Sequence, residues 1–321
     1  MNVLELIERS SARLEKAGVS FGHGTTNAFD EAAWLVLWKL GLPLDALDDV
    51  AEQALNAQQC ESVEALVDQR IATRQPAAYL TGEAWLQGVP FFVDARTIVP
   101  RSLIAEVLCE GTLDAWLDAW HEAGLEAGAK IGTDTGTEIG TATGTDTGTR
   151  TDEARAPRVL DLCTGNGSLA VLAALCWPQA QVEGTDLSAE ALAVAQRNVQ
   201  RHTLGARVNL RQGDGLAAAR GPYDLILCNP PYVNAASMAA LPAEYRAEPE
   251  LALAAGVDGM DFIRPVLAEA AAHLTPQGVF VLEIGHERGH FEAAFPKLQP
   301  VWLSTSAGDE QVLLLTREAL A

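Results

Sequence analysis

Basic residues are scarce in this sequence, and their scarcity narrows the range of partners. The 321 residues include 22 Lys and Arg against 43 Asp and Glu, which gives a formal net charge of −21 at pH 7. A protein that binds a nucleic-acid backbone tightly needs clustered Lys and Arg. We therefore expect no stable nucleic-acid binding, and the charge favours a basic partner instead.

Cysteines and long apolar runs are also few. The five cysteines, at positions 60, 109, 163, 176 and 228, include no CxxC pair. They form no zinc or disulfide framework and are typical of reduced thiols in the cytoplasm. The run Leu169–Trp177 is too short to span a bilayer, and the charged first twenty residues predict no signal peptide. We expect a cytoplasmic protein without membrane contact.

The first 75 residues have the spacing of amphipathic helices. Apolar residues recur every three or four positions, most clearly in Ala32–Leu40, which Asp30 opens, and in Glu61–Arg74. Pro76 ends this pattern. We therefore predict a small N-terminal helical domain over residues 1–75.

Glycine, proline and aromatic residues alternate in residues 76–101. This pattern predicts a hairpin-like connector with strands at Tyr79–Leu86 and Val89–Val99. Ser102 is then expected to cap a helix that continues to about Ala123.

Residues 131–149, within a segment that runs from 102 to 157, repeat Gly and Thr and contain few apolar side chains. Such a segment cannot bury enough apolar area to offset its ordering entropy, which predicts a flexible surface insertion. A calcium-binding glycine–aspartate repeat is the alternative, but the spacing is wrong and carboxylates are few.

Strands and helices alternate from Arg158 onward, which predicts an α/β fold with a mostly parallel sheet and helices on both faces. Only Ala307–Glu310 joins the last two of seven predicted strands, so that pair must be antiparallel. The strands are expected at Val159–Cys163, Gln181–Asp186, Val208–Gly213, Tyr223–Cys228, Gly278–Ile284, Val301–Ser306 and Gln311–Thr316, and the helices at about 167–177, 188–202 and 259–274.

Acidic residues occur at three successive strand ends. Asp161 opens the turn Asp161–Gly167, whose glycines let the backbone approach a ligand beside a helix N-terminus. Asp186 can accept both hydroxyls of a ribose, and Asp214 can reach an adenine amino group. Together they predict a nucleoside-type cofactor. The loose dinucleotide pattern Gly165-x-Gly167-x-x-Ala170 is the alternative, although the sheet lacks a second mononucleotide half.

The tetrapeptide Asn229-Pro230-Pro231-Tyr232 directly follows an apolar strand. The Asn229 side chain offers an acceptor oxygen, and a carbonyl next to proline has a fixed direction. Two such acceptors can bind both hydrogens of an NH2 group, and Tyr232 offers a flat face. The motif predicts a site that holds a planar nitrogen while a group is transferred to it. The alternative is a Pro-Pro turn that closes a strand.

On these motifs, residues 158–317 resemble a class I S-adenosylmethionine-dependent methyltransferase, with a Rossmann-like sheet. Nearly the whole chain is similar to the protein-glutamine N5-methyltransferase family, including the hairpin at 76–101. Phe21–Thr25 and Arg101–Glu106 most resemble the branch that methylates large-subunit ribosomal protein three. The release-factor branch would have Arg-Pro-Glu-Thr-Glu in place of the segment that begins at Arg101. The Gly/Thr insertion and Asn166 depart from the family pattern.

The resemblance implies that S-adenosylmethionine donates a methyl group to a glutamine side-chain amide in a basic ribosomal protein. It implies a substrate-recognition role for residues 1–75, a catalytic domain at 158–321 and a lid at Val233–Asp258. The implied catalytic residues are Asn229, Pro230, Pro231 and Tyr232, and the implied cofactor-binding residues are Asp161, Thr164, Gly165, Asn166, Gly167, Asp186, Leu187, Asp214, Gly215 and Asn229. The alternatives are the Gly-Gly-Gln loop of release factors, adenine-N6 methylation of nucleic acid, or a non-catalytic escort of a ribosomal protein.

A competing motif, His286-Glu287-Arg288-Gly289-His290, matches the HExxH pattern of zinc proteases. It begins directly after a predicted strand, Gly289 weakens a helix through it, and no convincing third ligand follows. We therefore expect no metal site.

Overall fold

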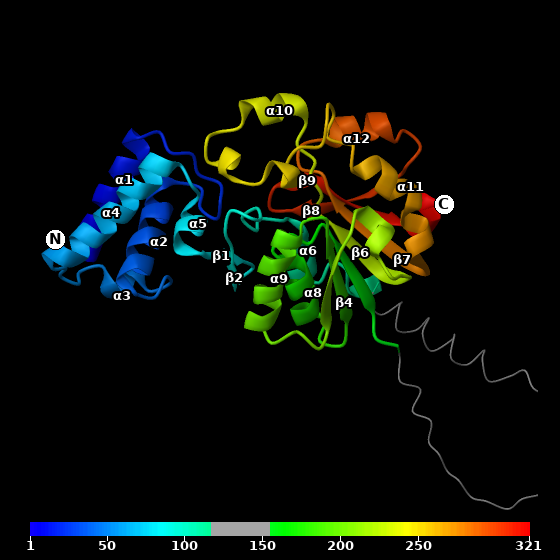
Figure 1. Ribbon diagram of the computed structural model, residues 1–321, viewed down its shortest axis with the longest axis horizontal. Helices are drawn as coiled ribbons and strands as arrows, with labels where there is room; N and C mark the ends of the chain where they lie inside the picture. Colours follow the sequence, from blue (N-terminus) through cyan, green and yellow to red (C-terminus); the bar gives the residue numbers. More distant parts are fainter. Residues whose placement is uncertain (117–154) are drawn as a thin grey trace, which may run out of the picture.

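A computed structural model describes residues 1–116 and 155–321. The N-terminal helices lie beside the sheet domain, and a small hairpin lies between them (Figure 1). The predicted insertion at 131–149 lies outside the described residues. Within the described ranges, no helix is long and apolar enough to cross a membrane.

Asparagine caps fix the starts of the N-terminal helices. Helix α1 (Val3–Lys16) and helix α4 (Ala57–Thr73) open at capping boxes formed by Asn2 and Asn56. Asn27 caps helix α2 (Ala28–Leu40), so the predicted start at Asp30 is wrong by two residues. A short helix, α3 (Leu47–Val50), follows, and apolar faces of α1, α2 and α4 form one core.

The connector contains less strand than predicted. Helix α5 (Ala77–Thr81) replaces the first half of the expected strand Tyr79–Leu86, and Gly82, at φ +71°, ends it. The hairpin consists of β1 (Glu83–Leu86) and β2 (Val89–Phe92). The expected continuation to Val99 is wrong because a turn held by the bond from Arg96 N to Asp94 Oδ1 (3.1 Å) follows. Helix α6 (Ile104–Cys109) ends at a turn, so the predicted continuous helix is interrupted there, and its expected end near Ala123 lies outside the described residues.

The sheet has the order β5-β4-β3-β6-β7-β9-β8, and β9 runs antiparallel to both of its neighbours. The predicted fold class is therefore confirmed. The strands are β3 (Arg158–Leu162), β4 (Gln181–Asp186), β5 (Val208–Gln212), β6 (Tyr223–Cys228), β7 (Leu274–Glu283), β8 (Val301–Thr305) and β9 (Gly308–Thr316).

Helices cover both faces of the sheet with separate apolar cores. One core joins α6 and helix α8 (Ser168–Cys176) to the sheet, with Val199 of helix α9 (Ala189–Arg201). The other joins the opposite face to helix α11 (Ile263–His273) and to Phe291 of helix α12 (Arg288–Ala294). Because β3, β4, β5 and β6 are mutually parallel, their carboxyl ends meet at one edge.

Candidate active site

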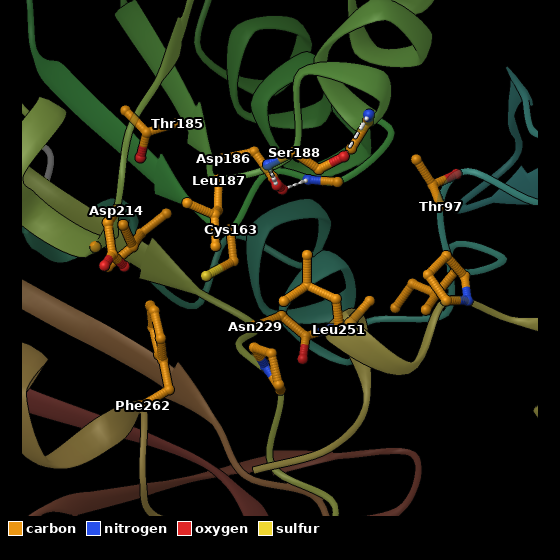
Figure 2. Close-up of a pocket in the computed structure, with 18 of the residues that line it drawn as sticks. Thr97, Cys163, Thr185, Asp186, Leu187, Ser188, Asp214, Asn229, Leu251 and Phe262 are labelled. Carbon is orange, nitrogen blue, oxygen red and sulfur yellow. Dashed lines mark hydrogen bonds between the residues drawn. The ribbon is translucent and has the colours of Figure 1, made fainter.

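Two adjoining cavities lie at the carboxyl edge of the parallel strands. They share four lining residues, Ile98, Cys163, Gly165 and Asn229. The larger has an empty volume of about 820 Å³, open to solvent, and Figure 2 shows Asp186, Asp214, Asn229 and Phe262 around it. The carboxyl ends of the strands in a parallel sheet are where α/β folds bind small ligands.

The glycine turn brings backbone close to the cavity. Gly165, at φ +55°, donates its N–H to Asp186 Oδ2 at 2.9 Å. Gly167, at φ +81°, contributes differently, because a Cβ there would lie 3.0 Å from the Ala195 Cβ of α9. Gly165 therefore shapes the ligand side of the turn, whereas Gly167 lets two helices approach one another.

Asp161 is buried beside the smaller cavity, and only one of its two carboxylate oxygens accepts hydrogen bonds from the described residues. Oδ2 accepts hydrogen bonds from the Thr164 hydroxyl and from Ala170 N, the latter at 2.9 Å. Oδ1 is buried and has no hydrogen-bond partner among the described residues. Burial raises the pKa of Asp161 to about 7. An ionised carboxylate with an unpartnered oxygen beside a small cavity fits a cationic amino group.

Asp186 and Asp214 line the larger cavity, together with Leu187 and Gly215. Asp186 Oδ1 accepts from Ser188 N at 2.8 Å, and burial raises the pKa of this carboxyl. Its oxygens keep lone pairs that can accept from a diol. Asp214 is exposed beside Phe262 on the same side of the cavity (Figure 2).

Asn229 lines both cavities, and Pro231 lines the larger one. Within residues 1–116 and 155–321, no group forms a hydrogen bond with the Asn229 side chain, so its amide is free for a ligand.

Pro230 and Tyr232 line neither cavity. The Tyr232 hydroxyl donates to Glu283 Oε1 at 3.4 Å, and a Cβ on Gly285 would lie 2.6 Å from its ring. Tyr232 therefore packs against the residues at the end of β7 and holds the motif beside that strand. Its predicted contact with a planar ligand stays a prediction, as do the site roles of the other motif residues.

Sequence reasoning missed part of the cavity wall. Arg96, Thr97 and Ile98 follow the hairpin and line the larger cavity, as does Phe262. No motif marks these positions. The predicted lid segment contributes Pro249, Leu251 and Ala252.

Glu248, next to Pro249 in the predicted lid, is buried in a set of charged groups. Arg101 donates from Nη1 and Nη2 to its two oxygens at 2.6 and 2.7 Å. Val99 N donates at 2.8 Å, and His23 Nε2 lies 3.5 Å away. Burial opposes ionisation, but His23 and Arg101 outweigh it and lower the pKa of Glu248 to about 2.

A second buried set of charged groups connects the predicted lid to the N-terminal helices. Arg70 is fully buried, and its Nε donates to Glu31 Oε1 at 2.9 Å. Its Nη1 lies 3.5 Å from Glu244 Oε1, and Arg74 Nη1 donates to that oxygen at 3.0 Å. Glu244 thus connects this short segment to the N-terminal helices, and Glu248 connects it to Arg101 and to His23.

Two residues of the HExxH motif, Glu287 and His290, contact each other. Glu287 accepts from His290 Nδ1 at 2.6 Å and from Asn234 Nδ2 at 2.7 Å. Helix α12 begins only at Arg288, inside the motif. Across the described parts of the chain, no cluster of three or more His, Cys, Asp or Glu side chains could hold a metal ion.

Known proteins resemble this chain over nearly its full length. The methyltransferase small domain family matches residues 137–244. The ribosomal protein uL3 glutamine methyltransferase of Bordetella pertussis is 50% identical over 98% of this chain and 95% of its own length. The proteins of the same name from Burkholderia pseudomallei and Neisseria gonorrhoeae are 45% and 42% identical, over 98% and 99% of this chain and 94% and 95% of their own lengths.

Proposed function

The chain belongs to the ribosomal protein uL3 glutamine methyltransferase family, and we propose that it transfers a methyl group from S-adenosylmethionine to a glutamine side-chain amide nitrogen of uL3. The observation that carries this proposal is the free Asn229 amide where the two cavities meet. Since the substrate is a ribosomal protein, we place the reaction in the cytoplasm.

The side chains present fit S-adenosylmethionine. The orphaned Asp161 oxygen suits its cationic amino group, Asp186 suits its ribose diol, and Asp214 with Phe262 suits a polar-edged aromatic base. When bound, the cofactor supplies a methyl group that is already activated by the sulfonium. The protein then needs to position the acceptor nitrogen more than to supply acid or base.

The Asn229 oxygen and the Pro230 carbonyl would accept the two hydrogens of the glutamine NH2 group. An amide nitrogen is a weak nucleophile because its lone pair is delocalised into the carbonyl. Two acceptors favour a pyramidal nitrogen and stabilise the positive charge that develops on it, until the methylated nitrogen loses one of its hydrogens to solvent as a proton. Tyr232 and Gly285 fix the backbone that aims these acceptors.

Cofactor affinity should fall in mild acid. A carboxyl with a pKa of about 7 is ionised in about nine-tenths of molecules at pH 8 and in about a tenth at pH 6. Since only ionised Asp161 attracts the cationic amino group, calorimetry should give a Kd for S-adenosylmethionine about tenfold weaker at pH 6. Asp161→Asn should bind weakly at both values. A wild-type Kd that does not change between pH 6 and 8 would contradict this role for Asp161.

Methyl transfer from labelled S-adenosylmethionine to purified uL3 tests the proposal directly. We expect one labelled glutamine in uL3, located by mass spectrometry, and little label on a release factor assayed in parallel. Label on the release factor alone would keep the chemistry and overturn the substrate. No label on either acceptor would favour the escort hypothesis.

A further inference from the structure

A second concave surface lies away from the cofactor cavities. It runs from the N-terminal helices α2 and α3 to the hairpin strand β1. Figure 1 shows β1 between these helices and the sheet domain. We call it the aromatic groove and define it by Phe29, Trp34, Leu44, Leu47 and Trp85. None of these residues lines either cofactor cavity.

The groove exposes side chains that a folded chain normally buries. Phe29 is 39% exposed and Trp85 46% exposed, and they come from two different structural units. Clustered exposed aromatic side chains mark binding surfaces, and Trp is among the residues that contribute most to binding energy.

The charges in the groove are all of one sign. Asp30 and Asp45 line it, and no Lys or Arg does. Neither carboxylate forms an ion pair within the part of the chain that the structure describes. The next helix, α3, adds Asp48 and Asp49. A cationic partner would therefore supply the positive charge that this surface lacks.

From this groove we infer that a basic segment of the protein substrate, with a large apolar side chain among its Lys or Arg residues, docks here during methylation. This rests on the proposed function. A second copy of the chain is disfavoured, because it brings a formal charge of −21 to an acidic surface. Nucleic acid is disfavoured for the same reason.

Two segments connect the groove to the active site. Gly24 and Thr25 line the groove, while the ring of the preceding residue, His23, lies with its centroid 4.2 Å from that of Tyr245, tilted by 47°, and beside Glu248. The hairpin that carries Trp85 continues into Arg96–Ile98, which line the cofactor cavity. A substrate held in the groove is thus held next to the elements that form the methyl-transfer site.

Steady-state kinetics with full-length uL3 test the inference through Trp85→Ala and Asp45→Lys. Each should raise KM for uL3 about tenfold and leave kcat and the Kd for S-adenosylmethionine unchanged. The Asp45→Lys effect should shrink at high salt, whereas the Trp85→Ala effect should persist. Both residues are exposed, so the thermal unfolding midpoint should stay near that of the wild type.

Leu175→Ala and Glu269→Lys are the matched controls, because both residues are exposed and lie outside the groove. Wild-type KM in both groove variants would overturn the inference. Direct binding of uL3 separates the two proposals. Wild-type protein that binds uL3 through the groove without methylating it contradicts the proposed function alone. Groove variants that bind and methylate uL3 as the wild type does contradict the groove alone.

Discussion

Replacing Asn229 with alanine is expected to lower kcat for glutamine methylation about 100- to 1000-fold, the loss typical of removing one preorganised group that stabilises developing charge. The Asn229 side chain has no hydrogen-bond partner in the described structure and lines both cavities, so its removal breaks no internal contact. The Kd for S-adenosylmethionine should change about threefold or less, because the cofactor keeps its three carboxylates.

Single-turnover kinetics at saturating cofactor and uL3 would measure this loss separately from binding. Asn209→Ala is the matched control, since Asn209 is exposed on β5, outside both cavities. An Asn229→Ala enzyme with full turnover would show that another group orients the glutamine. A large rise in cofactor Kd with unchanged kcat would assign Asn229 to cofactor binding instead.

Replacing Arg70 with alanine is expected to lower the free energy of unfolding by about 3–5 kcal/mol, because the change leaves Glu31 buried without its cation and leaves Glu244 with Arg74 alone. Removing one member of a buried ion pair costs far more than the pair itself contributes. Burial already raises the pKa of Glu31 despite Arg70, and it should rise further once the guanidinium is gone.

Chemical denaturation of the wild type and the variant would measure this difference. Arg9→Ala provides the control: Arg9 pairs with Glu64 at 3.1 Å, but its side chain is 58% exposed. Removing the Arg9 side chain should lower the free energy of unfolding by about 0–1 kcal/mol. Similar losses for the two variants would mean that water reaches the Arg70 site.

The sheet could be predicted because its strands are apolar and alternate with helices. The predicted bounds of β4 and β6 agree with the structure, since Asp186 and the Asn229 motif end these strands sharply. The helix starts at Ala28 and Ala57 were missed, because their capping asparagines lie outside the apolar pattern. Around Tyr79, aromatic and apolar residues favoured a strand, yet Gly82 ends a short helix there.

The polar residues of the site could be predicted because each lies at or near the carboxyl end of a strand of one parallel sheet. The wall at Arg96–Ile98 could not, because only tertiary packing brings it to the cavity. The burial of Arg70 could not be predicted from the sequence either. Its partner Glu244 lies 174 residues away, and no local pattern distinguishes a buried arginine on a helix from an exposed one.

The buried charges of the predicted lid segment limit which segments of this enzyme can be exchanged with those of its relatives. Glu244 and Glu248 take their cations from the N-terminal helices and the connector, so the segment after Asn229–Tyr232 makes structural contacts with both of these parts of the fold. A chimera that exchanges residues 1–75 alone would place foreign side chains against these carboxylates. Exchanges of substrate specificity should therefore move residues 1–101 together with 241–249, so that each buried carboxylate keeps the cation it folded with.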